Sequence, residues 1–267
     1  MSHCACHFAT LPPVRGRLEL SLGKKEFSRI ISYILDILYP RRCAICDTIL
    51  RKDEICLCSR CRQNLPIVKG PVCMKCGRPL DDDTKEYCKE CRRRDHLFDQ
   101  GCSPLLYRRG IQPSMMRFKY GSRPEYGEFY GRAIWGFAKR QLQIWKPDVI
   151  IPVPLHRSRY RKRGYNQAAL IAGTLSKLSG IPMDETLVVR TRKTAPQKGL
   201  TGSGRRKNLK DAFEVRKESG KEIPRTILLV DDIYTTGSTM DALSEVLKKS
   251  GVKNIYFVTG AIAPGES

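Results

Sequence analysis

Two adjacent carboxylates followed by a run of hydroxyl side chains form the strongest chemical signal in the sequence. Asp231 and Asp232 follow the apolar stretch 226–230, which the pattern predicts to be a buried strand. The residues after them, in a loop that leads into an expected helix and at the start of that helix, include Tyr234, Thr235, Thr236, Gly237, Ser238 and Thr239. Hydroxyl and backbone N–H groups at a helix start bind phosphate, and nearby carboxylates bind sugar hydroxyls and Mg²⁺.

This segment therefore predicts a site for a ribose 5-phosphate. The alternative is an aspartate helix cap followed by an ordinary serine- and threonine-rich turn. Two acids together at the end of an apolar strand make that alternative weaker.

Eight of the twelve cysteines form an internal repeat of Cys-x2-Cys pairs. Cys43, Cys46, Cys58 and Cys61 recur thirty residues later as Cys73, Cys76, Cys88 and Cys91. Two pairs supply the four thiolates of a structural zinc site, so we expect one or two Zn²⁺ ions. Spacing leaves open whether the pairs combine sequentially or interleave. A redox role is disfavoured, and no role is assigned to Cys4, Cys6, Cys56 or Cys102, of which the last two are expected to be packed thiols.

The elements that must position these residues alternate between strand and helix from residue 102 onward. Strands are predicted over 101–107, 148–154, 187–189, 226–230 and 255–259. Helices are predicted over 111–120, 125–145, 166–179 and 238–250. The pattern predicts an α/β fold with a doubly wound, mostly parallel sheet, whose ligands bind beyond the carboxyl ends of the strands. Three segments follow: a leader with an amphipathic helix (1–41), the cysteine region (42–101) and the α/β domain (102–267).

Composition narrows the functional classes further. The chain has 267 residues and a formal charge of +22, which favours polyanionic partners. No apolar run reaches the roughly 20 residues of a membrane-spanning helix, and no signal peptide is evident, so we expect a cytoplasmic protein. Attachment to the inner face of the membrane stays open, although the helix over 24–38 is expected to pack on the protein itself. The glycine-rich stretch 199–206 lacks the lysine of an ATP-binding P-loop and is rejected as one.

Three motifs occurring together resemble the ComF/ComFC (GntX-like) family, which is associated with natural competence and DNA uptake. They span 151–167, 190–213 and 227–239, and the last is similar to the signature with which type I phosphoribosyltransferases bind 5-phosphoribosyl 1-pyrophosphate (PRPP). With the cysteine region, the resemblance covers residues 28–262. It implies a phosphoribosyltransferase-like domain preceded by a small zinc-ribbon-like domain.

The resemblance also implies roles for individual residues. Asp231 and Asp232 would hold the ribose 2′- and 3′-hydroxyls, and the loop 235–239 the 5′-phosphate, with Mg²⁺ accompanying PRPP. The pyrophosphate and the mobile lid that closes over it would be served by His156, Arg157, Arg159, Arg192, Gln197 and Arg205. The reaction would be displacement at ribose C1, with Asp231, Asp232, Arg157 and Arg159 as catalytic residues.

The second substrate stays open, because no segment resembles a base-selecting hood. Single-stranded DNA and other DNA-uptake proteins are further expected partners. The alternative function is a non-catalytic, zinc-containing DNA-binding module that uses the PRPP site for sensing or not at all. The basic run 157–163 supports polyanion binding, against the alternative of a solvated basic face.

Overall fold

Four parallel strands form the central sheet, in the order β1–β6–β5–β2. They are β1 (Gln100–Cys102), β2 (Val149–Pro152), β5 (Thr226–Tyr234) and β6 (Asn254–Ile262). All four residues of β2 and the first five of β5 are buried, as expected for strands covered on both faces. The doubly wound parallel sheet predicted from the alternating pattern is confirmed.

This computed structural model describes residues 39–192, 209, 211–216 and 222–265. The predicted leader helix over 24–38 and the lid residues Gln197 and Arg205 lie outside the described residues. Residues Arg41–Ser267 belong to one compact unit. Within the described part of the chain, no helix has the length and apolar character needed to cross a membrane.

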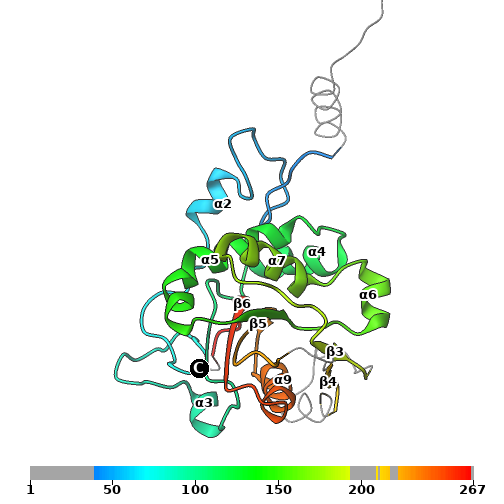
Figure 1. Cartoon of the computed structure of the whole chain (residues 1–267). Helices are drawn as coiled ribbons and strands as arrows, with labels where there is room; N and C mark the ends of the chain where they lie inside the picture. Colours follow the sequence, from blue (N-terminus) through cyan, green and yellow to red (C-terminus); the bar gives the residue numbers. More distant parts are fainter. Residues whose placement is uncertain (1–38, 193–208, 210, 217–221, 266–267) are drawn as a thin grey trace, which may run out of the picture. The chain divides into compact units, whose positions relative to one another are not determined.

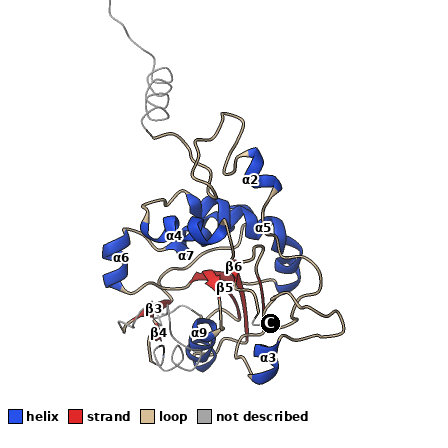
Figure 2. Ribbon diagram, turned by 180° about the vertical axis from the view of Figure 1, so that it is seen from behind, coloured by secondary structure: helices blue, strands red, loops and turns tan. Residues whose placement is uncertain are grey.

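Helices cover both faces of the sheet. On one face lie α4 (Ile111–Tyr120), α5 (Tyr126–Trp145) and α7 (Gln167–Ser179), and on the other lies α9 (Ser238–Lys249), as Figures 1 and 2 show from opposite sides. In α5 the buried residues Tyr130, Ile134, Ala138 and Leu142 recur every fourth position, which turns one stripe of the helix to the sheet. The sheet is therefore the middle layer of three.

The strand order reverses between β2 and β5. From β2 the chain passes through α7 to Met183, which pairs in parallel with Ile150 on the outer side of β2. From β5 the chain passes through α9 to β6, on the opposite side. In doubly wound sheets such a reversal opens a crevice at the carboxyl ends of the two strands, and ligands bind there.

Three smaller features differ in detail from the sequence-based expectation. The strand predicted at 187–189 is β3 (Val188–Arg190), which pairs antiparallel with β4 (Phe213–Val215) in a separate two-stranded sheet. Strand β1 ends at Cys102, earlier than predicted. The basic run forms a short helix, α6 (Arg157–Arg163), where a loop was expected.

Local capping explains helix α6. His156 Nδ1 accepts a hydrogen bond from the backbone N–H of Ser158, and Gly164 ends the helix in the left-handed conformation with φ of 81°. The remaining described helices, α2 (Ser59–Gln63) and α3 (Lys89–Arg93), each begin directly after a cysteine of the repeat.

Candidate functional site

The two acids lie within strand β5 and not after it. The strand continues to Tyr234 because β6 runs alongside it, with Asp231 opposite Thr259 and Tyr234 opposite Ile262. On the other side, β2 ends at Pro152, and the N–H of the next residue, Val153, donates to the carbonyl of Val230 at 2.8 Å. Among the described residues, β5 therefore pairs only with β6 beyond Val230, and Asp231 and Asp232 lie at the mouth of the crevice.

The negative charge of the two carboxylates is partly balanced by a lysine that was not predicted from the sequence. Lys119, near the end of α4, places its Nζ 2.9 Å from Asp232 Oδ2, while Asp231 Oδ1 accepts the N–H of Asp232 at 2.8 Å. Burial, followed by the neighbouring Asp232 carboxylate, raises the pKa of Asp231 to about 7. Near neutral pH the pair therefore carries less than two full negative charges.

The hydroxyl loop leads directly into helix α9. Gly237 precedes the helix with φ of 77°, and a Cβ at this position would lie 2.8 Å from both His96 Cε1 and the Tyr234 hydroxyl, so only glycine fits. Thr236 Oγ1 and Ser238 Oγ are 2.9 Å apart. Gly237, at the start of the helix, has no side chain with which to cap it, and the first N–H groups of a helix face the loop before it, as in a phosphate site.

A basic cavity of about 490 Å³ lies at the carboxyl end of β2. Its polar and charged lining residues come from the segment after β2, from β3 and from the residues flanking the small sheet: His156, Arg157, Tyr160, Asn166, Glu185, Arg190, Thr191 and Arg216. Burial and the nearby Arg159 lower the pKa of Arg190 to about 10, while Asp231 acts in the opposite direction. Arg190, which lines the cavity, is thus near enough to Asp231 to interact with it electrostatically.

The structure thus places most of the predicted site residues at the carboxyl ends of two neighbouring strands, β2 and β5. His156 and Arg157 line the cavity, half-buried Arg159 is close enough to Arg190 to affect its pKa, and the loop 235–239 follows the acids on β5. Arg192 is exposed beyond β3. Arg190 lies in the motif 190–213, but no role was predicted for it. Lys119 lies in none of the three motifs, so its contact with Asp232 can be found only from the folded structure.

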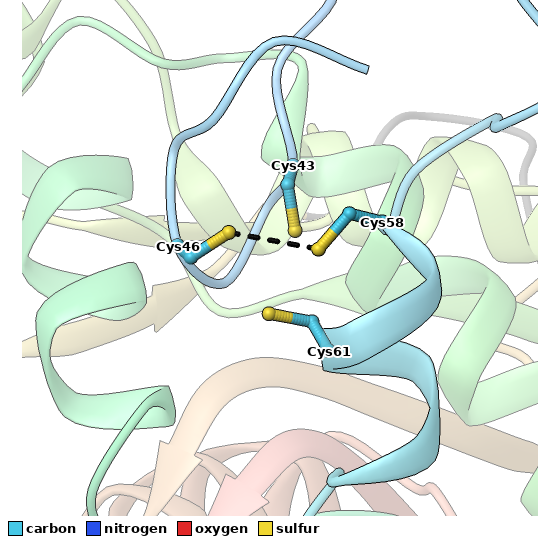
Figure 3. Close-up of side chains that lie close together, drawn as sticks. All are labelled: Cys43, Cys46, Cys58 and Cys61. Atoms are coloured by element: carbon cyan, nitrogen blue, oxygen red, sulfur yellow. Dashed lines mark hydrogen bonds between the residues drawn. The ribbon is translucent and has the colours of Figure 1, made fainter. Parts of the chain in front are cut away.

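The eight repeat cysteines form two separate clusters, which settles the grouping in favour of sequential pairs. Their sulfur atoms lie within 4.8 Å of one another in each cluster: Cys43, Cys46, Cys58 and Cys61 in the first, and Cys73, Cys76, Cys88 and Cys91 in the second. Figure 3 shows the first cluster, with its four side chains directed toward a common centre.

The cluster geometry fits zinc. The Sγ atoms of Cys46 and Cys58 are 3.7 Å apart, and those of Cys76 and Cys88 are also 3.7 Å apart. Four Zn–S bonds of about 2.3 Å in a tetrahedron separate the sulfur atoms by about 3.8 Å. Burial raises the pKa of the Cys56 thiol to about 11 and that of Cys102 to about 12, as expected for packed thiols outside the clusters.

The two cysteine ribbons repeat the same backbone structure. In the first (residues 41–63) the N–H of Cys43 donates to Thr48, and in the second (residues 71–93) the N–H of Cys73 donates to Arg78. The residue after the second cysteine has a left-handed backbone in both, Asp47 with φ of 64° and Gly77 with φ of 74°.

Each ribbon joins a different hydrophobic core. Cys43 and Cys61 of the first ribbon pack in the core that contains Tyr130 of α5. Cys73 and Cys76 of the second pack with the apolar face of α9. The ribbons are therefore built into opposite layers of the fold.

Comparison with known proteins defines the class. Residues 34–92 match the family model of the double zinc ribbon domain, and residues 137–264 match that of the phosphoribosyl transferase domain. The chain thus combines a double zinc ribbon with a phosphoribosyltransferase-type fold.

Relatives that match this chain along nearly their full length identify the family. Competence protein F of Haemophilus influenzae is 34% identical over 215 residues, which cover 74% of this chain and 93% of the relative. DNA utilization protein YhgH of Shigella flexneri is 29% identical, with 81% and 94% covered. Competence protein ComFC of Streptococcus pneumoniae is 26% identical, with 78% and 88% covered. The chain belongs to the competence protein F family.

Proposed function

We propose that this protein binds PRPP together with Mg²⁺ in the crevice between β2 and β5 and transfers its phosphoribosyl group to an acceptor. One arrangement carries the proposal: Asp231, Asp232 and the start of α9 lie at the carboxyl end of β5, and a basic cavity lies at the carboxyl end of the neighbouring strand β2, where the strand order reverses. Acids for the ribose, N–H groups for the 5′-phosphate and cationic side chains for the pyrophosphate then lie along one ligand.

In this proposal each group acts on one part of PRPP. The carboxylates of Asp231 and Asp232 accept hydrogen bonds from the ribose hydroxyls, and the loop 235–239 binds the 5′-phosphate. Lys119 holds the Asp232 carboxylate in position through its ion pair. Bound Mg²⁺ supplies charge neutralisation at the pyrophosphate.

The leaving group is served by the cationic side chains of the cavity. Departing pyrophosphate gains charge as the bond at ribose C1 breaks, and His156, Arg157 and Arg159 stabilise it. Arg192, Gln197 and Arg205 are proposed to close over it from the lid.

Replacing both acids tests this function. Asp231→Asn with Asp232→Asn removes two charged acceptors, so calorimetric titration with PRPP and Mg²⁺ should show an affinity at least tenfold lower than that of the wild type. Asp81→Asn with Asp83→Asn makes the same charge change at exposed positions and should leave the affinity unchanged. Equal PRPP affinity in the first variant and the wild type would exclude the proposed site.

The names of the relatives support a physiological role for the proposed chemistry. They are called competence and DNA utilization proteins. We propose that this protein, too, serves DNA uptake and transformation, together with other proteins of that process. The two sites of four cysteines each require reduced thiols, which favours the cytoplasm.

Helix α6 supports a second candidate function, binding of single-stranded DNA. Arg157, Tyr160, Arg161 and Lys162 are exposed on it, beside the basic cavity. Phosphate contacts weaken with salt in proportion to their number, and Tyr160 offers a ring on which a base can stack.

The salt dependence of DNA affinity tests whether α6 contacts DNA. Arg161→Gln with Lys162→Gln should reduce the slope of log affinity against log salt by about 1.4, since each single-strand phosphate contact contributes about 0.7. The same change at Arg92 and Arg93 of α3, which are also exposed, should reduce it less. Equal slopes for the two variants would contradict binding through α6.

A further inference from the structure

The second ribbon directly contacts the proposed phosphate loop, 157 residues further along the chain. Arg78, two residues beyond the ligand Cys76, donates a hydrogen bond from its Nη2 to the backbone carbonyl of Thr235. The arginine is only 5% exposed, so this charged donor has been taken out of water to meet the loop. A hydrogen bond from a charged group in such surroundings is among the stronger ones in proteins.

A second contact holds the other end of the loop. The ring of His96, just after the second ribbon, is fully buried, and its Nδ1 lies 2.8 Å from Oδ2 of Asp241 in the first turn of α9. The N–H of Leu97 donates to Oδ1 of the same carboxylate at 3.1 Å. Both oxygens of Asp241 are thereby bound by the segment that follows the second ribbon.

The imidazole of His96 also packs directly against the loop at Gly237. Its Cε1 lies where a side chain at Gly237 would have to be. The ring stacks on Phe98 with centroids 4.8 Å apart, and Phe98 meets the edges of Tyr234 and Phe257. Tyr234 is the last residue of β5 before the loop, so one aromatic cluster joins the ribbon to the strand that carries the acids.

The first ribbon has no equivalent arrangement in the described part of the chain. The position corresponding to Arg78 is Thr48, whose hydroxyl lies 3.0 Å from the sulfur of its own ligand Cys46. The first ribbon contacts α4 and α5 instead, through Arg117 to the Ile45 carbonyl and Tyr126 to Asp47. The two copies thus share a backbone but differ in what they hold.

We propose that the second ribbon is the scaffold of the phosphate loop, with Arg78 and His96 as positioning residues that hold 235–239 in the conformation that accepts a 5′-phosphate. This inference rests on the proposed function for the identity of the ligand. The backbone from which Arg78 extends is wrapped around the second cysteine cluster, so metal at that cluster fixes the arginine as well.

Replacing Arg78 with methionine tests the scaffold. Arg78→Met keeps the apolar part of the side chain and removes the donor. We expect two zinc ions per chain as in the wild type, faster hydrogen exchange of the amides in 235–239, and about tenfold weaker binding of PRPP. Arg93→Met makes the same charge change at an exposed position of the second ribbon and should match the wild type in all three measurements. Arg78→Lys, which retains a donor, should recover part of the affinity.

Two outcomes would overturn the proposal. One is an Arg78→Met variant with two zinc ions whose PRPP affinity and amide exchange equal those of the wild type. If that variant fails to fold, Arg78→Gln, which is too short to reach Thr235, replaces it, and the same equality would again overturn the proposal. A wild type that does not bind PRPP refutes the proposed function only, because amide exchange in 235–239 still decides whether Arg78 holds the loop.

Discussion

Asp231 is the residue whose surroundings most constrain the chemistry of the site. It lies within a buried strand beside a second acid. Burial, followed by the charge of the neighbouring Asp232, raises its pKa to about 7. A ribose hydroxyl donates most strongly to an ionised carboxylate, so a ligand that donates to Asp231 favours loss of this proton.

The raised pKa predicts a pH-dependent stability. Between about pH 4 and pH 7 the folded chain holds a proton on Asp231 that the unfolded chain has released. The free energy of unfolding should therefore fall as pH rises through this window, by about 1 kcal/mol per pH unit from this group. Asp231→Asn cannot ionise, so urea unfolding from pH 5 to 7 should show the variant gaining stability relative to the wild type. A difference between the two that does not vary with pH would contradict the raised pKa.

Sequence reasoning located the acids but not the side chains that act on them. Asp231 and Asp232 are adjacent in the sequence and follow an apolar run, which is a local signal. Lys119 and Arg78 reach the site from more than a hundred residues away, and each is one basic residue among 49. Only the packing of α4 and of the second ribbon distinguishes them from the other cations.

At the scale of elements, periodicity was a good guide wherever burial was continuous. Helix α4 has the predicted bounds, and α5, α7 and α9 differ from theirs by one residue at an end. Strand β5 runs four residues further than predicted, because pairing with β6 overrides the polar character of the two acids. Helix α6 was missed because seven residues with five basic side chains show no apolar period, and only its caps reveal it.

The turn between β5 and α9 gives the element-scale prediction. Gly237→Ala places a Cβ against His96 and Tyr234 in a left-handed backbone, so the free energy of unfolding should fall by about 2 kcal/mol or more. PRPP binding should be lost with it. Gly136→Ala, at an exposed site of α5 with nothing within 4 Å, should instead raise stability by about 0.5–1 kcal/mol. Urea unfolding compares them, and a Gly237→Ala variant as stable as Gly136→Ala would contradict the close fit.

At the scale of the whole molecule, the ribbons and the α/β layers form one structure. The cysteine repeat predicted the metal clusters, yet spacing alone left their grouping open, and the separation of the two clusters decided it. Spacing also carries no information on where the ribbons pack. They lie in different hydrophobic cores, and the second contacts the proposed phosphate loop.

Part of the overall charge of +22 can be assigned to one place in the fold. It first indicated polyanionic partners in general, but the cationic side chains of α6, β3 and their surroundings gather at a cavity beside two acids. DNA bound through α6 would lie next to the same crevice. We therefore propose that this crevice is a single PRPP site.

Calorimetric titration of the wild-type protein with PRPP and Mg²⁺, followed by displacement with pyrophosphate and with ribose 5-phosphate, tests that claim most directly. We predict one PRPP per chain, with each fragment binding more weakly and each displacing PRPP, because the fragments occupy the two halves of one site. PRPP that binds no more tightly than inorganic phosphate, or that neither fragment displaces, would contradict it.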